Sequence, residues 1–222
     1  MKKLLCALLA LILILPSTLT SCTSKKALYS ISDGDRLYEI LGSNRKRTVR
    51  VIEKDSVLWE SKVRIKKSVG DANGTYGLAV LDLNFDGLSD IKITLSKENE
   101  KNVEVCYLQN AETGLYEKSE ALEDLFNIGT VEEQKLILSY AGVTTDADSG
   151  CTVETVVSYR WQGDGLIPYR RLTLTYYPAQ NCYCYGVADY LEGSFRFDEP
   201  NEKWLTPQQF AETDWSFFYY FR

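Results

Sequence analysis

Asp82-Leu83-Asn84-Phe85-Asp86-Gly87-Leu88-Ser89-Asp90 is the stretch from which the fold of this chain is predicted. An apolar run, residues 76–81, precedes it. After it, apolar residues at positions 91, 93 and 95 alternate with polar residues at 92, 94 and 96. Alternation with a period of two indicates a β-strand rather than a helix. Residues 82–90 are therefore predicted to be a loop that joins two strands.

The side chains of this loop predict a calcium site. Calcium takes about six to eight oxygen ligands, and a glycine such as Gly87 at the sixth position allows the backbone to turn sharply among them. Oxygen atoms lie at the first, third, fifth, seventh and ninth positions. The predicted ligands are the side chains of Asp82, Asn84, Asp86 and Asp90 and the carbonyl of Leu88.

A turn without metal is the alternative. Asp86-Gly87 is a strong hairpin signal on its own, because Gly accepts a positive φ and Asp tolerates one. Asp82 and Asn84 then cap the turn through hydrogen bonds to backbone groups. A tight turn does not need further oxygen atoms at alternate positions, so the spacing favours calcium.

Residues 1–21 are typical of a signal peptide. Met1-Lys2-Lys3 is basic, and residues 4–15 are apolar but too few to span a bilayer comfortably. Leu19-Thr20-Ser21-Cys22 resembles the lipobox of bacterial lipoproteins, which implies cleavage before Cys22 and a lipid anchor on Cys22. An ordinary secretory signal is the alternative. Both place the mature protein outside the cytoplasm, and the lipid would hold it at the cell membrane.

The charge of the chain excludes one class of partner. The full chain has a net charge of −6, and loss of residues 1–21 removes two lysines and no acidic residue, which leaves −8. Nucleic-acid binding depends on cations that meet phosphates, so we expect no nucleic-acid partner. An acidic chain suits a cation or a basic protein partner instead.

Four cysteines remain outside the signal peptide and the lipobox: Cys106, Cys151, Cys182 and Cys184. Export permits disulfides, and four cysteines allow three pairings among which the sequence does not choose. A direct Cys182–Cys184 bond is disfavoured by distance. The chain contains no His, so one or two structural disulfides are favoured over a zinc site.

We predict three parts: the signal peptide 1–21, a lipidated tether 22–35, and a single β-rich domain 36–222. Short alternating segments separated by Gly, Asn and Asp turns indicate a mostly β fold, an antiparallel sandwich or barrel. One or two short helices are expected: a short helix or a helical turn at residues 119–126, and a short helix after Thr206-Pro207. The aromatic end, residues 215–221, is predicted to be a last buried strand, with a partner-facing patch as the alternative.

A family resemblance is carried by several stretches in order. They are residues 82–91, Cys106-Tyr107-Leu108 followed by Glu112-Thr113-Gly114-Leu115-Tyr116, and Ser158-Tyr159-Arg160-Trp161 followed by Gly165-Leu166. The pattern resembles exported bacterial proteins with a D-x-N-F-D-G-x-x-D hallmark. It is similar to calcium-binding immunity proteins paired with lysozyme-like effectors of type IV secretion, and to periplasmic inhibitors of i-type lysozyme. The resemblance implies a β-rich fold, a calcium ion near Asp82, Asn84, Asp86 and Asp90, and no catalysis. Leu88 departs mildly, because that position is often aromatic in the family.

Catalysis is not expected. Without His, the usual Ser-His and Cys-His nucleophile pairs are excluded. The acidic residues that suggest a two-carboxylate glycosidase show no distinctive spacing; they are Glu120, Glu123, Glu132 and Glu133. The residues therefore predict a non-catalytic binding module, and the family resemblance implies that it inhibits or gives immunity against a lysozyme-like cell-wall hydrolase. A structural or sensory envelope lipoprotein, in which calcium is only a structural staple, is the alternative.

Overall fold

A computed structural model of the chain describes residues 26–43, 45–66, 69, 74–98, 101–197 and 202–215. The predicted signal peptide, Cys22 and the aromatic residues 216–221 lie outside this part. Within it, no helix is long and apolar enough to cross a membrane.

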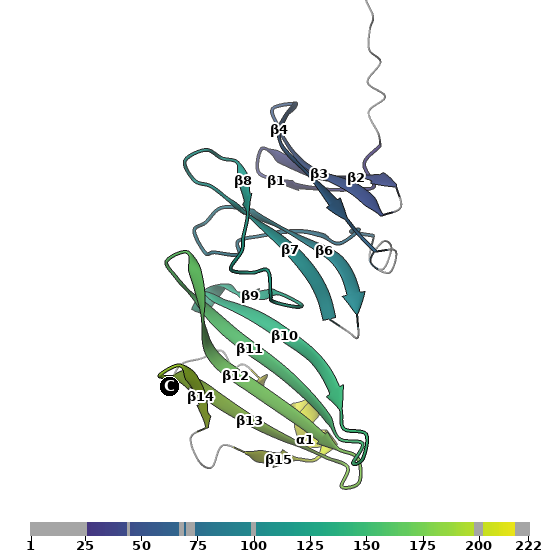
Figure 1. The fold of residues 1–222 in the computed structure, drawn as a ribbon, viewed down its shortest axis with the longest axis vertical. Coiled ribbons are helices and arrows are strands. Elements are labelled where there is room, and N and C mark those ends of the chain that lie inside the picture. Colours follow the sequence, from purple (N-terminus) through teal and green to yellow (C-terminus); the bar gives the residue numbers. More distant parts are fainter. Residues whose placement is uncertain are drawn as a thin grey trace, which may run out of the picture.

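The described chain is built from three antiparallel sheets, as the alternating pattern predicts. Sheet A has the order β1 (Tyr29–Asp33), β2 (Arg36–Ser43), β3 (Lys46–Glu53) and β4 (Ser56–Arg64). Sheet B has the order β5 (Leu78–Leu81), β6 (Asp90–Glu98), β7 (Lys101–Gln109) and β8 (Tyr116–Lys118). Figure 1 shows the sheets following one another along the long axis, with sheet A at the top and sheet C at the bottom.

Sheet C is the largest. Its strands are β9 (Gly129–Val131), β10 (Leu136–Thr145), β11 (Thr152–Gln162), β12 (Gly165–Tyr177), β13 (Cys182–Leu191), β14 (Ser194–Phe197) and β15 (Lys203–Leu205). They run in the order 14-13-12-11-10-9, and β15 also pairs with β13. The short 3-10 helix η2 (Glu132–Gln134) links β9 to β10.

Sheets A and B pack face to face as a sandwich. Alternate residues of each strand point into the space between the sheets, since successive side chains of a strand face opposite sides. The buried residues of this core are Tyr38, Ile40, Val49, Val51, Val63, Ile65, Leu78, Ile91, Ile93, Val105 and Tyr116. Of the two architectures predicted, the sandwich is therefore the one found.

A second core lies between sheets B and C. It joins Leu83 of the loop, Cys106 of β7 and Ile137 of β10 to three apolar residues of the segment between β8 and β9, namely Leu122, Leu125 and Ile128. Tyr159 and Trp161 of β11 pack against it. Sheet C is thus attached to the sandwich through buried apolar surface as well as through the chain itself.

One predicted boundary is wrong. The tether was predicted to extend to residue 35, but β1 pairs with β2 over Tyr29–Asp33, because Tyr29 and Ile31 pack against the core of sheets A and B. At residues 119–126, where a short helix or a helical turn was predicted, the structure has turns. There the Glu123 and Leu125 amides donate three residues back, to the carbonyls of Glu120 and Leu122, at 3.1 and 3.3 Å.

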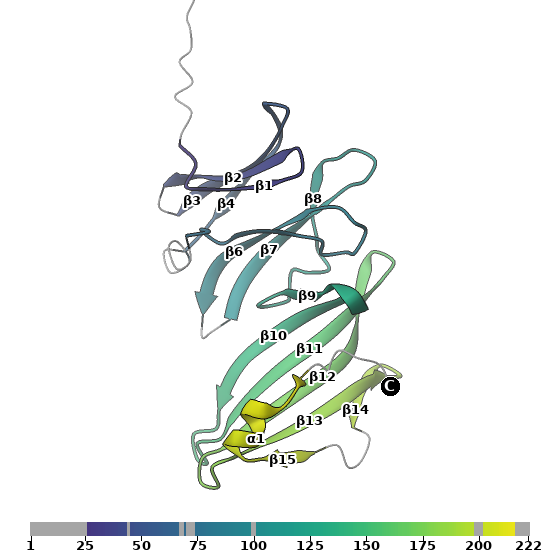
Figure 2. The same ribbon diagram turned by 180° about the vertical axis from the view of Figure 1, so that it is seen from behind.

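The second predicted helix is confirmed. The helix α1 (Pro207–Glu212) begins at Thr206, whose side chain accepts from the Gln209 amide while the Gln209 side chain accepts from the Thr206 amide. Phe210 stacks on Tyr183 of β13 with ring centroids 4.1 Å apart. Figure 2 shows α1 lying against one face of sheet C, where it contacts β13 and β15.

Candidate metal centre

The loop at residues 82–90 leaves sheet B after β5 and returns to it at β6. Asp82 accepts from the Asp86 amide at 3.2 Å and from the Gly87 amide at 2.8 Å, one bond to each carboxylate oxygen. Asn84 also accepts from the Asp86 amide at 3.2 Å, and its side-chain nitrogen donates to the Asp86 carboxylate at 2.9 Å. The side chains of Asp82, Asn84 and Asp86 are thereby brought together on one side of the loop.

The backbone of this loop is bent in the way that its sequence requires. Gly87 has a φ of +86°, a region that residues with a Cβ rarely adopt, and Phe85 has a φ of +60°. Phe85 packs against the core between sheets B and C, which offsets the cost of its conformation. The loop is therefore fixed by burial on one side and by its own hydrogen bonds on the other.

Asp90 differs from the other three predicted side-chain ligands. It is fully buried, with 0% exposure, and its two oxygen atoms accept from the amides of Leu83 at 2.7 Å and Gln109 at 2.8 Å. These bonds tie the start of the loop to the end of β7. Asp90 acts here as an anchor of the loop rather than as a member of the Asp82–Asn84–Asp86 group.

The loop also contacts the other two sheets. The Ser89 hydroxyl donates to the Asp33 carboxylate at the β1–β2 turn of sheet A. The Trp161 indole N–H, from β11 of sheet C, donates to the Leu83 carbonyl at 2.8 Å. Residues 82–90 therefore form the junction at which all three sheets are hydrogen-bonded to one segment. The sequence did not predict these two contacts, because neither partner is near the loop along the chain.

The loop offers fewer carboxylates than its sequence predicts for a calcium site. Among the described residues, no group of three or more His, Cys, Asp or Glu side chains is arranged to hold a metal ion. Only two of the converging side chains, Asp82 and Asp86, are carboxylates; the third, Asn84, offers an amide oxygen. All three are hard oxygen donors of the kind calcium prefers, and waters commonly complete such a site. The oxygen atoms of these three side chains accept hydrogen bonds within the loop, as in a turn without metal, so calcium binding by the loop stays a prediction.

Burial raises the pKa of Asp90 to about 6, and the nearby Asp86 and Asp82 carboxylates add to the rise, while the two amide bonds oppose it. The carboxyl of an unfolded chain titrates near 3.8. Between pH 3.8 and about pH 6, Asp90 is protonated in the folded state and ionised in the unfolded state. The free energy of unfolding therefore falls as the pH rises through this range.

We therefore expect a pH-dependent difference between the unmodified protein and Asp90→Asn, both in chelator. Between pH 4 and pH 7 the stability advantage of the unmodified protein over the variant should fall by about 2 kcal/mol. Thermal melting across this range measures the difference. A difference that does not change with pH would contradict the assignment of the titration to Asp90.

The four cysteines are free, so the disulfides predicted from the exported state are not formed in this structure. Cys106 lies on β7 in sheet B, whereas Cys182 and Cys184 lie on β13 in sheet C. Cys151 lies just before β11, and Cys182 lies on β13, where it pairs with Tyr177 of β12. Since β12 lies between β11 and β13, Cys151 and Cys182 are two strand spacings apart. Neighbouring strands lie about 4.8 Å apart, so two strand spacings exceed the reach of a disulfide.

The four glutamates considered for glycosidase chemistry, Glu120, Glu123, Glu132 and Glu133, are all exposed. Glu123 forms an ion pair with Lys118 at 2.7 Å, and Glu132 and Glu133 lie on η2 between β9 and β10. The structure thus places them on two separate surface segments.

The fold is similar to that of a Xanthomonas protein described as type IV secretion system related. The two structures superpose with a TM-score of 0.54 at 14% sequence identity, over 77% of this chain and 92% of that chain. No protein-family model and no curated protein matches the chain. At this identity the likeness shows a shared fold.

Proposed function

We propose that this protein is a membrane-anchored, non-catalytic binding protein that neutralises a lysozyme-like cell-wall hydrolase and uses calcium to stabilise its binding surface. The observation that carries the proposal is the junction at residues 82–90, where one acidic loop is hydrogen-bonded to all three sheets. A bound ion at such a place stabilises a surface and needs no reactive group.

The acidic side chains near the junction give this surface its charge. Asp33 and Asp35 of the β1–β2 turn and Asp86 of the loop are exposed, and Ser89 links the two segments. The turn that holds Glu112 lies close by, because Gly114 approaches the Arg36 guanidinium. An exposed acidic surface of this kind suits a basic hydrolase, since complementary charge increases the rate of association.

Asp86→Ala is expected to abolish the stabilisation of the protein by calcium. An ion that binds only the folded state stabilises it by about 2.7 kcal/mol at one hundred times its dissociation constant, and the variant loses one of the two converging carboxylates. Melting in calcium and in chelator measures the effect. Asp164→Ala, in the exposed β11–β12 turn, is the control. Equal melting of the unmodified protein in calcium and in chelator would reject the calcium site.

Cys22→Ser is expected to remove the lipid and to release the protein from membranes, because stable anchoring needs the acyl chains. Fractionation of cells and incorporation of labelled palmitate measure the two effects. A variant that still takes up palmitate would show that the lipid is attached elsewhere.

The hydrolase proposal is tested by inhibition of peptidoglycan lysis by lysozyme-like enzymes. The unmodified protein is expected to inhibit, and the variant Asp35→Lys/Glu112→Lys is expected to lose at least tenfold in potency. The control variant Asp146→Lys/Asp148→Lys makes the same change of charge in the loop between β10 and β11, and we expect it to inhibit as strongly as the unmodified protein. Absence of inhibition together with intact calcium stabilisation would favour the envelope lipoprotein whose calcium is only structural.

A further inference from the structure

Basic side chains gather at one end of sheet A. Lys46 of β3 lies directly opposite Arg64 of β4, and Lys62 lies opposite the next outward-facing residue of β3, Thr48. Residues that are paired in this way share a face, and this is the outer face, because Arg47 and Val63 point into the core. Arg45 precedes β3 at the same end. All four basic side chains are exposed.

This arrangement costs stability. Like charges directly opposite in an antiparallel pair are destabilising, and Lys46 and Arg64 form such a pair. Over the part of the chain that the structure describes, no ion pair involves Arg45, Lys46, Lys62 or Arg64. Further along the same sheet the basic residues are neutralised: Arg50 pairs with Glu39 at 2.7 Å and Arg36 with Glu53 at 3.0 Å. Among the described residues on strands β2, β3 and β4, the basic side chains without an ion pair therefore lie at one end of the sheet.

A buried cation adds to the charge of this end. Arg47 is 7% exposed, and its Nε and Nη1 atoms have no hydrogen-bond partner among the described residues. Its guanidinium lies 4.9 Å from the centroid of the Tyr76 ring, and this contact leaves its charge unneutralised. The end of sheet A thus carries five positive charges within a chain whose net charge is negative.

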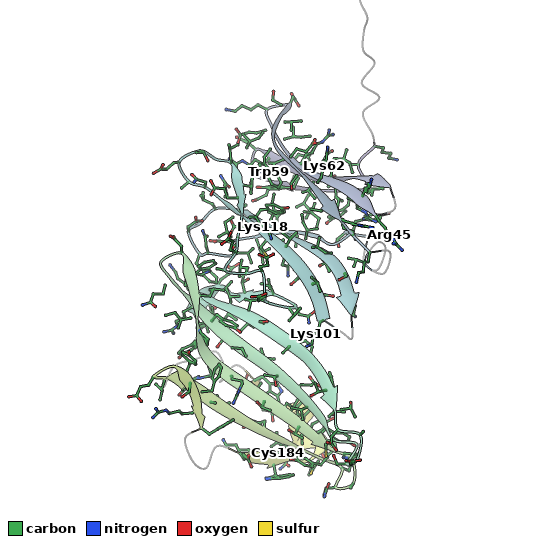
Figure 3. All side chains as sticks on the ribbon, in the orientation of Figure 1. Arg45, Trp59, Lys62, Lys101, Lys118 and Cys184 are labelled. Carbon is green, nitrogen blue, oxygen red and sulfur yellow. The ribbon has the colours of Figure 1, made fainter. Side chains whose placement is uncertain are left out.

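The same end is where the described chain begins. The Leu28 amide donates to the Ile40 carbonyl at 2.8 Å, and Tyr29 of β1 pairs with Ile40 of β2. Two residues further along β2, Gly42 pairs with Arg47 of β3. The strand β1 therefore starts beside the basic hairpin, and the acidic β1–β2 turn lies at the opposite end of the sheet. In Figure 3, Arg45 lies at the end of sheet A from which β1 starts in Figure 1.

Chain length limits the distance between this end and the anchor. Cys22 precedes Lys26 by four residues, which span at most about 14 Å when fully extended. This span is an upper limit, and the tether also allows shorter separations. A lipid on Cys22 therefore lets the basic end come within one Debye length of the phospholipid headgroups, which is about 8 Å at physiological salt.

We propose that the basic end of sheet A, formed by Arg45, Lys46, Arg47, Lys62 and Arg64, is a docking surface for the phosphate headgroups of an anionic bilayer. The proposal rests on the lipid anchor proposed for Cys22. Anionic lipids attract basic residues near the surface, each contributing roughly fivefold in partitioning. The docked protein has its acidic β1–β2 turn and the loop at residues 82–90 turned away from the membrane.

The test uses the mature chain from residue 22 with Cys22→Ser, which keeps every contact described here and has no acyl chain. Its cosedimentation is measured with vesicles of phosphatidylcholine alone and with vesicles containing about one third phosphatidylglycerol. We expect at least tenfold stronger binding to the anionic vesicles, weakening as salt is raised. Lys46→Glu/Arg64→Glu should reduce this binding at least 20-fold, and Lys135→Glu/Lys203→Glu, with the same change of charge in exposed positions of sheet C, should reduce it less than threefold.

Equal binding to both kinds of vesicle, or equal loss in both double variants, would overturn the docking surface. The melting temperature of each variant shows that it is folded. The result does not depend on acylation. If the full chain takes up no palmitate at Cys22, the lipid anchor alone is refuted. If the chain is acylated but its Cys22→Ser form does not bind anionic vesicles, the docking surface alone is refuted.

Discussion

Asp90→Ala is expected to lower the free energy of unfolding by about 3 kcal/mol, a large fraction of the stability of an ordinary domain. The variant leaves the Leu83 and Gln109 amides buried without an acceptor, at about 1–3 kcal/mol each. Removing the carboxylate also removes its own desolvation cost, which the raised pKa reveals, so the net loss is smaller than the bonds alone suggest. Chemical denaturation measures it.

The control for this prediction is Asp164→Ala, which removes an exposed carboxylate and should change stability by less than about 0.5 kcal/mol. Asp90→Asn should fall between the two, because it keeps one acceptor and introduces a donor that faces an amide. Equal stability of Asp90→Ala and the unmodified protein would show that the loop is not anchored through this carboxyl.

Lys92→Met is expected to cost a similar amount, about 3 kcal/mol, through a different mechanism. The Lys92 ammonium lies 3.3 Å from Glu104, whose side chain is 2% exposed, and it also donates to the Ile128 carbonyl. The other Glu104 oxygen accepts from the Ile128 amide at 2.5 Å. Removal of one partner leaves a buried charge uncompensated, which is costly, whereas removal of both charges is much less so.

A double-mutant cycle distinguishes the loss of one charge of the buried pair from the loss of both charges. Glu104→Gln keeps an acceptor for the Ile128 amide and removes the charge, so Lys92→Met/Glu104→Gln should be more stable than Lys92→Met alone. Lys118→Met, which breaks the exposed ion pair with Glu123, is the matched control and should cost less than about 1 kcal/mol. If Lys92→Met were as mild as Lys118→Met, the buried pair would not contribute to joining residues 126–128 to sheet B.

The sequence predicted a mostly β, antiparallel fold because many segments alternate between apolar and polar side chains. It failed for β1, where Ser30, Ser32 and Asp33 give a polar composition that hides the inward-facing Tyr29 and Ile31. At residues 119–126 it left a short helix and a helical turn open, because the spacing of Leu122 and Leu125 fits both. These two residues are buried by a core between two sheets, which no local pattern reveals.

The candidate site was predicted in part. Asp82, Asn84 and Asp86 converge, as their alternate positions indicate. Asp90 occupies a ligand position by spacing, but its direction is set by the start of β6 and by the amide of Gln109 on the neighbouring strand. The contacts with Asp33 and Trp161 depend on how the sheets stack, which is information that a single loop does not contain. Two segments of the family resemblance, residues 82–91 and 158–161, nevertheless meet through the Trp161–Leu83 bond.

The Trp161 indole gives the junction an intrinsic optical reporter. Its N–H is bonded to the backbone of the loop, and its ring packs against the core between sheets B and C. Detachment of sheet C from the loop would expose this ring to water and shift its fluorescence to longer wavelength, even if every sheet stayed folded. Emission from Trp161, isolated by replacing Trp59, Trp204 and Trp215 with Phe, therefore distinguishes loosening between the sheets from unfolding of the whole molecule.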